Sequence, residues 1–170
     1  MAIWPNLRAE SDQYFIHEIR VRPTREGLPK LLMIHGFGGG GAVFYKMMKH
    51  LREHFEVFTI DLLGMGMSGR PPYEIKHNFE ATIAYFTESI HAWVEQSPLG
   101  KDGEKYILLG HSMGGMFAGH YAMKYPNNIA KLVFMSPVGI SEPPEALKPE
   151  TVLQNLDEGL ARFGATWMDN

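Results

Sequence analysis

Short apolar runs alternate along this sequence with segments whose apolar residues recur every three or four positions. A short continuous apolar run is typical of a strand buried on both faces, whereas the wider spacing is typical of one face of a helix. The pattern predicts strands, the first of them an outer strand, at 14–21, 31–34, 57–60, 106–109 and 131–135. Because strands and helices alternate, we predict an α/β fold in which helices cover both faces of a mostly parallel sheet.

Two of the helical segments have clear apolar stripes. The first stripe comprises Val43, Phe44, Met47, Met48 and Leu51. The second comprises Phe79, Ile83, Phe86, Ile90 and Trp93. Asn78 lies directly before the second stripe and is its predicted N-cap, since asparagine favours that position. A third helix is predicted over 113–125, and Pro126 ends it.

The pattern changes after Pro137. The sequence Ser-Glu-Pro-Pro-Glu at 141–145 predicts a linker, and an amphipathic segment follows it. The apolar stripe of that segment comprises Val152, Leu153, Leu156, Leu160 and Phe163. We predict a surface helix rather than a membrane-facing one, because its polar face carries carboxylates instead of lysines.

The composition excludes several classes of function. The chain has 170 residues, 45% hydrophobic and 21% charged, which is typical of a globular domain with a real core. A formal net charge of -3 provides no basic field for nucleic acid, and no run of about 18 apolar residues predicts a transmembrane segment. The lack of cysteine excludes disulfides and thiolate metal sites. The first residues do not fit a secretory signal, so we expect an intracellular location.

In a sheet of this kind, function is expected at the loops that follow the carboxyl ends of the strands. Those loops are predicted to begin near His35, Asp61, Gly110 and Ser136.

The first of these loops is rich in glycine. In the stretch HGFGGGGAVF, residues 35–44, five of the ten residues are glycine. Glycine permits positive φ and close approach to the main chain, which suits either a bound diphosphate or amides directed at a developing negative charge. The spacing Gly36-x-Gly38-x-x-Gly41, followed by Asp61 after the next strand, fits a dinucleotide-binding fingerprint. A dinucleotide site is therefore one of two open interpretations of this loop.

Two other motifs are weaker. A second G-x-G-x-x-G pattern at 64–69 is followed by Pro71 and Pro72, which would stop the required helix, so it predicts a turn. His50, Glu53 and His54 have the H-x-x-E-H spacing of inverted zinc peptidases, but the sequence offers no obvious third ligand. We therefore expect no metal and no cofactor.

The strongest motif is LLGHSMGG at 108–115, a G-x-S-x-G pattern between a predicted strand and a predicted helix. In this context the serine occupies a strained turn, the nucleophile elbow, that projects its hydroxyl above the sheet. Ser112 is the predicted nucleophile, and Gly110 and Gly114, together with His111, form the turn around it. The amide of Met113 is a predicted oxyanion donor.

If Ser112 is the nucleophile, the glycine-rich loop lies beside it. The amide of Phe37 is then the second predicted oxyanion donor, and His35, Gly36 and Gly38 shape the loop that presents it.

Four segments, HGFGGG, DLLGMGMSGRP, ILLGHSMGG and KYPNNIAKLVFMSPVG, together resemble the alpha/beta hydrolase fold superfamily. They are most similar to the subfamily that contains N-acylphosphatidylethanolamine lipases and the lipid-droplet coactivator of triglyceride lipase. The resemblance extends from about Tyr14 to Pro144. It implies that 1–140 is the N-terminal part of a hydrolase core, truncated before the last strands, and that 141–170 is a linker and the start of a cap-like helical segment. It also implies a lipid-like ester or amide substrate and action in the cytoplasm or at lipid surfaces.

This resemblance places the acid and the histidine of a catalytic triad after the nucleophile, on later strands. His120 is the one histidine beyond Ser112 in the sequence, and it falls on the helix that leaves the elbow, so the general base is unassigned. We therefore expect either a missing C-terminal half or a protein partner to cover the strand at 131–135. The alternative function is a non-catalytic hydrolase-like subunit or interaction module in a larger assembly.

Overall fold

The computed structural model describes residues 13–75, 78–100 and 103–139. The chain divides into two units, 1–138 and 139–170, and the first contains the sheet. The strand order is β1-β3-β2-β4-β5. The strands are β1 Glu18–Val21, β2 Lys30–Ile34, β3 Glu56–Ile60, β4 Tyr106–His111 and β5 Ile129–Met135. Only the β1–β3 pairing among these five strands is antiparallel, which confirms the predicted mostly parallel sheet.

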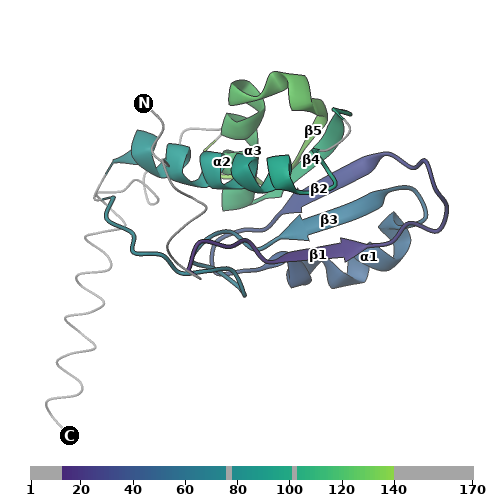
Figure 1. Ribbon diagram of the computed structural model, residues 1–170, viewed down its shortest axis with the longest axis horizontal. Coiled ribbons are helices and arrows are strands. Elements are labelled where there is room, and N and C mark those ends of the chain that lie inside the picture. Colours follow the sequence, from purple (N-terminus) through teal and green to yellow (C-terminus); the bar gives the residue numbers. More distant parts are fainter. Residues whose placement is uncertain (1–12, 76–77, 101–102, 140–170) are drawn as a thin grey trace, which may run out of the picture. The chain divides into compact units, whose positions relative to one another are not determined.

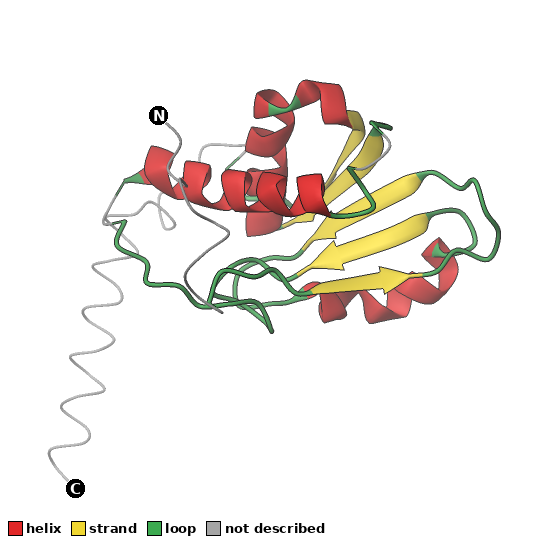
Figure 2. Ribbon diagram, in the orientation of Figure 1, coloured by secondary structure: helices red, strands yellow, loops and turns green. Residues whose placement is uncertain are grey.

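Helices cover both faces of this sheet, as predicted (Figures 1 and 2). They are the 3₁₀ helix η1 Gly41–Phe44, α1 Tyr45–Leu51, α2 Phe79–Gln96, α3 Met113–Lys124 and the 3₁₀ helix η2 Pro126–Asn128. Alternate residues of β2 point to opposite faces. Leu32 and Ile34 pack with buried residues of α2 and α3, whereas Leu31 and Met33 belong to a second cluster with Phe44 and Met48.

The predicted apolar face of the first helix is wrong in part. Phe44 and Met48 are buried, but Val43 is 54% exposed and Met47 is 37% exposed. Two successive helical residues differ by about 100° around the axis, so a short helix that touches the sheet along one narrow line buries only one of each pair. On α2 the predicted stripe is also wrong at its first residue, because Phe79 is 59% exposed.

The predicted boundaries of α2 and α3 are close to those found. The Asn78 side chain accepts a hydrogen bond from the Ala81 amide at 2.9 Å, so the predicted N-cap is confirmed. Helix α3 ends at Lys124, just before Pro126. The outer strand β1 is shorter than predicted, because only 18–21 of the interval 14–21 pair with β3.

Strand β5 is the last strand of the sheet that the structure describes, and Val133 and Phe134 on it are 41% and 43% exposed. The predicted linker at 141–145 and the amphipathic stripe at 152–163 lie outside the described residues. No helix in the described ranges combines the length and hydropathy needed to cross a bilayer.

Candidate active site

Ser112 occupies the turn between β4 and α3, with φ 54° and ψ −121°. This region is rarely populated by residues other than glycine, so the turn needs support from its surroundings. The support comes from the backbone after β5. The Ser112 amide donates to the Met135 carbonyl at 3.1 Å, and the Val138 amide donates to the Ser112 carbonyl at 3.1 Å. The Ser112 hydroxyl caps no helix amide and so is not engaged in holding the turn.

Three glycines let this turn pack closely. A Cβ atom at Gly110 would lie 2.4 Å from the Gly114 carbonyl oxygen, and one at Gly114 would lie 2.3 Å from the His35 carbonyl oxygen. A Cβ at Gly115 would lie 2.7 Å from the Cβ of Pro137. The start of α3 is therefore pressed against the ends of β2 and β4, which explains why side chains are excluded there.

The glycine-rich loop lies directly against Ser112. A Cβ at Gly36 would be 2.9 Å from the Ser112 Cβ and 3.2 Å from the His111 Nδ1. Residues 36–39 form a tight turn in which the Gly39 amide donates to the Gly36 carbonyl at 3.2 Å and Gly38 has φ +67°. Positive φ at the third residue is typical of a type II turn. The structure thus brings the two predicted site loops together.

The two predicted oxyanion donors lie on these loops. Within the described residues, the amides of Phe37 and Met113 donate to no backbone or side-chain acceptor. The Phe37 side chain is 83% exposed. Both amides are therefore available as hydrogen-bond donors on the loops that meet at Ser112.

His35 stabilises the glycine-rich loop by hydrogen bonds of both its ring nitrogens to backbone groups. Its side chain is fully buried; Nδ1 donates to the Gly36 carbonyl at 2.7 Å and Nε2 accepts from the Leu62 amide at 3.0 Å. Burial lowers the pKa of His35 below its usual value, although the Gly36 carbonyl and Asp61 oppose this shift. His35 is thus a neutral ring with both nitrogens engaged, which excludes it as a general base in this state.

Asp61 has a structural role that the sequence did not reveal. Oδ1 accepts from the Gly41 amide at 2.6 Å, while Oδ2 accepts from the Met67 amide at 2.7 Å and from His17 Nδ1 at 3.1 Å. Burial alone raises the pKa of Asp61, but these amides and His17 reverse that effect and hold the pKa below its usual value. The sequence signal was an aspartate directly after a predicted strand, where it also forms part of the dinucleotide fingerprint.

These contacts also bear on the dinucleotide interpretation. That interpretation needs Asp61 to bind ribose hydroxyls, yet both of its carboxylate oxygens already accept bonds from the protein. Gly41 and Gly66 are explained by packing, because a Cβ at Gly41 would lie 1.9 Å from the Thr59 hydroxyl and one at Gly66 would lie 2.3 Å from Asp61 Oδ2. The glycines therefore serve close packing around buried polar groups.

The other sequence motifs do not form sites. Helix α1 ends at Leu51, so His54 lies beyond the helix that carries His50. In the described ranges no cluster of three or more histidine, aspartate or glutamate side chains could hold a metal ion. The His120 ring, on helix α3, packs edge-on against the Phe79 ring with centroids 5.9 Å apart.

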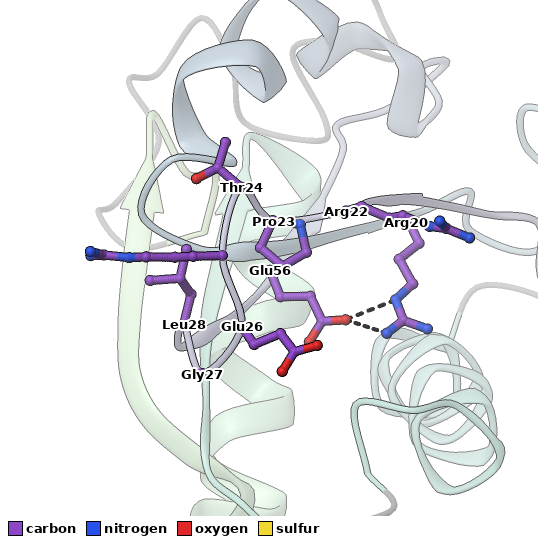
Figure 3. A pocket seen from close by; sticks show the side chains of 9 residues that line it. Arg20, Arg22, Pro23, Thr24, Glu26, Gly27, Leu28 and Glu56 are labelled. Atoms are coloured by element: carbon purple, nitrogen blue, oxygen red, sulfur yellow. Dashed lines mark hydrogen bonds and ion pairs between the residues drawn. The ribbon is translucent and has the colours of Figure 1, made fainter.

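A hollow of about 750 Å³ lies at the opposite end of the sheet, between the loop that connects β1 to β2 and the start of β3. Figure 3 shows Arg20 and Glu56 facing each other there, and the Arg20 Nε donates to Glu56 Oε1 at 2.8 Å. Because β2, β3 and β4 are parallel, the loop before β2 is at their amino ends and Ser112 is at their carboxyl ends. This hollow is therefore separate from the candidate site.

Comparison with known proteins gives one family and a set of longer relatives. A family model described as alpha/beta hydrolase fold matches residues 29–169. The 1-acylglycerol-3-phosphate O-acyltransferase of Arabidopsis thaliana is 35% identical over 144 residues, which are 85% of this chain and 31% of that protein. The (lyso)-N-acylphosphatidylethanolamine lipase of Mus musculus is 33% identical over 155 residues, or 89% of this chain and 44% of the lipase. The chain thus spans less than half the length of either relative.

Solved structures show the same fold. A thermophilic esterase from Thermogutta terrifontis superposes with a TM-score of 0.61 at 27% identity, covering 77% of this chain and 43% of the esterase. An epoxide hydrolase from Bacillus megaterium superposes with a TM-score of 0.57 at 21% identity, covering 72% of this chain and 39% of that enzyme. The second similarity shows the fold alone. Since one fold supports several chemistries, the site itself must carry the functional argument.

Proposed function

The chain belongs to the alpha/beta hydrolase fold family, and from this premise we propose that it carries the nucleophile of a serine hydrolase acting on a lipid-like ester or amide. The observation that carries the proposal is the turn at Ser112. A serine with φ 54° between a strand and a helix, with the unpaired amides of Phe37 and Met113 on the loops around it, is typical of a nucleophile elbow with its oxyanion donors.

In the proposed reaction the Ser112 hydroxyl attacks the substrate carbonyl carbon while a general base takes the hydroxyl proton. The carbonyl oxygen becomes negative in the tetrahedral intermediate, and the amides of Phe37 and Met113 donate hydrogen bonds to it. The N-terminus of α3 adds a favourable positive field. Collapse of the intermediate expels the alcohol or amine with the proton from the base, and water then hydrolyses the acyl-serine.

The general base and its acid belong to the proposal but not to the described residues. Within those residues no histidine is hydrogen-bonded to the Ser112 hydroxyl. We place both groups on further strands that pair beyond β5, contributed by a longer form of the chain or by a partner protein. The exposure of Val133 and Phe134 supports this, because a further strand beside β5, with the segments that connect it, would cover such side chains.

The lipid-like substrate class is supported by two observations. The two relatives act, by their names, on acylglycerol phosphates and on N-acylphosphatidylethanolamine. In addition, Phe37 and Met67 expose large apolar side chains on loops that leave the carboxyl ends of β2 and β3. An acyl chain would bury this surface favourably. We also propose that the protein acts in the cytoplasm or at a lipid surface, where a lipid-like substrate is found.

The test is covalent labelling of the full-length protein from its native source with a fluorophosphonate, which reacts with an activated serine. We expect a label on Ser112, and we expect Ser112→Ala to abolish both labelling and turnover, since an enzyme without its nucleophile keeps only residual catalysis. Ser136→Ala is the matched control, because Ser136 is another serine at positive φ, 45°, on the neighbouring loop. Normal turnover by Ser112→Ala would refute the assignment.

The second candidate is a non-catalytic hydrolase-like subunit that uses this fold for interaction. It is favoured by the fact that, among the described residues, no histidine is hydrogen-bonded to the Ser112 hydroxyl. It predicts that the full-length protein, in complex with its partner, takes no fluorophosphonate label even though Ser112 is intact.

A further inference from the structure

The turn that carries the Phe37 amide is tied at both ends to buried polar side chains. On one side His35 Nδ1 donates to the Gly36 carbonyl at 2.7 Å. On the other side Asp61 Oδ1 accepts from the Gly41 amide at 2.6 Å. His35 is fully buried and Asp61 is 4% exposed. Because buried hydrogen bonds of this kind are costly to break, the segment between them has little freedom to move.

Asp61 joins three separate segments through one carboxylate. In addition to Gly41, it accepts hydrogen bonds from the Met67 amide at 2.7 Å and from His17 at 3.1 Å. The surrounding space is filled, since a Cβ at Gly66 would lie 2.3 Å from Oδ2 and one at Gly40 would lie 3.0 Å from Oδ1. No other side-chain type combines two acceptor oxygens with a volume that fits here.

We infer that Asp61, assisted by His35, is a positioning residue that holds the Phe37 amide where the oxyanion of the proposed acyl transfer forms. This inference rests on the proposed function. Asp61 does not touch the reacting atoms; it acts by fixing the Gly41 end of the loop, while His35 fixes the Gly36 end. Since the turn lies against Ser112, a displacement of the loop would move one of the two oxyanion donors away from its target.

The charge states of the pair suit this role. The hydrogen bonds that hold the loop need an ionised Asp61, whose oxygens accept three of them. They also need a neutral His35, whose Nε2 accepts from the Leu62 amide at 3.0 Å. The pKa of each group lies below its usual value. Burial raises the pKa of Asp61, but the hydrogen bonds that it accepts from Met67, Gly41 and His17 lower it by more. Burial lowers the pKa of His35 more than the Gly36 carbonyl and Asp61 raise it. Both groups therefore keep the required state around neutral pH.

The experiment compares kinetics of the full-length enzyme and its Asp61→Asn variant. Asparagine has a single acceptor oxygen, so its NH₂ group faces at least one of the three donors and the loop should shift. We expect kcat to fall by about 10- to 100-fold with KM changed by less than about threefold, since the hydrogen bond from the Phe37 amide to the oxyanion is made only in the transition state. Asn78→Ala, which removes a helix cap elsewhere, is the destabilised control and should leave kcat unchanged well below its melting temperature.

A double-mutant cycle separates positioning from general damage. Phe37→Pro removes the amide N–H, and proline is favoured at the second position of a type II turn, whereas Phe37→Ala removes the ring and keeps the N–H. If Asp61 acts through this amide, Asp61→Asn has little further effect on kcat in the Phe37→Pro background and its full effect in the Phe37→Ala background.

The positioning role would be overturned if the losses of kcat in Asp61→Asn and Phe37→Pro multiplied in the double variant. It would also be overturned if Asp61→Asn left kcat unchanged while Ser112→Ala was inactive. Either result would leave the proposed function intact. Full activity in Ser112→Ala would overturn the proposed function and this inference with it. If Asp61→Asn does not fold, His35→Gln takes its place, with His35→Asn as the conservative variant expected to keep the bond to the Gly36 carbonyl and to restore kcat.

Discussion

Two glycines of helix α3 share a helical backbone but meet very different surroundings. A Cβ at Gly114 would lie 2.3 Å from the His35 carbonyl oxygen and 2.5 Å from that of Ile34, which are backbone atoms that cannot easily move. A Cβ at Gly119 would meet only the Phe134 ring, at an ordinary 3.5 Å. The effect of a methyl group is therefore set by contact with the sheet at Gly114 and by helix propensity at Gly119.

We predict opposite effects of alanine at these two positions. Gly114→Ala should lower the free energy of unfolding by about 1 to 3 kcal/mol, the usual cost of overpacking. Gly119→Ala should raise it by about 0.5 to 1 kcal/mol, because alanine is the better helix former. Urea unfolding of both variants checks this, and equal effects would show that the close approach of α3 to β2 is not as described.

At the scale of elements, the N-terminus of α2 depends on a single side chain. Asn78 Oδ1 accepts from the Ala81 amide at 2.9 Å, which satisfies one of the free amides of the first turn. Asn78→Ala should lower the free energy of unfolding by about 1 kcal/mol, while Asn78→Asp, which keeps an acceptor, should have little effect. Thermal unfolding measures the difference, and an equal loss in both variants would exclude a capping role.

The packing of α2 on α3 includes a buried polar chain. The Tyr106 hydroxyl donates to the Tyr121 hydroxyl at 2.9 Å, and the Tyr121 hydroxyl lies 3.2 Å from His91 Nδ1. The His91 ring also stacks on Tyr125 with centroids 3.7 Å apart. Since the Tyr121 hydroxyl accepts the hydrogen bond from Tyr106, its own O–H is available to donate to His91 Nδ1, and this hydrogen bond needs a neutral His91.

At the scale of the whole molecule, this arrangement makes stability depend on pH. Burial lowers the pKa of His91 below its usual 6.5; Lys124 acts in the same direction and Glu95 opposes it. Burial likewise lowers the pKa of His35. Below pH 6.5 the unfolded chain therefore binds more protons than the native state at these histidines. Their contribution to stability is complete above that pH and is lost as the pH falls through the native-state values.

We predict that the melting temperature falls between pH 7 and pH 5 and that His91→Gln makes this fall smaller, because glutamine still accepts from Tyr121 but does not titrate. Asp61 acts in a different range. Its pKa is held below the usual 3.8, so its contribution is present above that value and is lost only in stronger acid. A pH slope that is unchanged in His91→Gln would contradict the assignment to His91.

The order and type of the elements were predictable because they depend on near neighbours in the chain. The apolar run of β2, the cap at Asn78 and the stop at Pro126 each act within a few residues, and the strand-to-helix turn at Ser112 is marked by the glycines on either side of it. The predicted apolar faces of the helices were wrong where burial depends on a surface distant in the sequence, as at Val43 and Phe79, which are exposed.

What the sequence by itself determined is the succession of strands and helices, the α/β class and the location of the candidate nucleophile, since local periodicity and turn chemistry specify them. Only the tertiary structure decided which loops meet. The order β3-β2-β4 places the loops after these three strands side by side, so Gly36 contacts Ser112, as a nucleophile there implied, and Asp61 binds Gly41, which the sequence did not indicate. Sheet order is a long-range property, and the sequence pattern of one strand does not encode its neighbours.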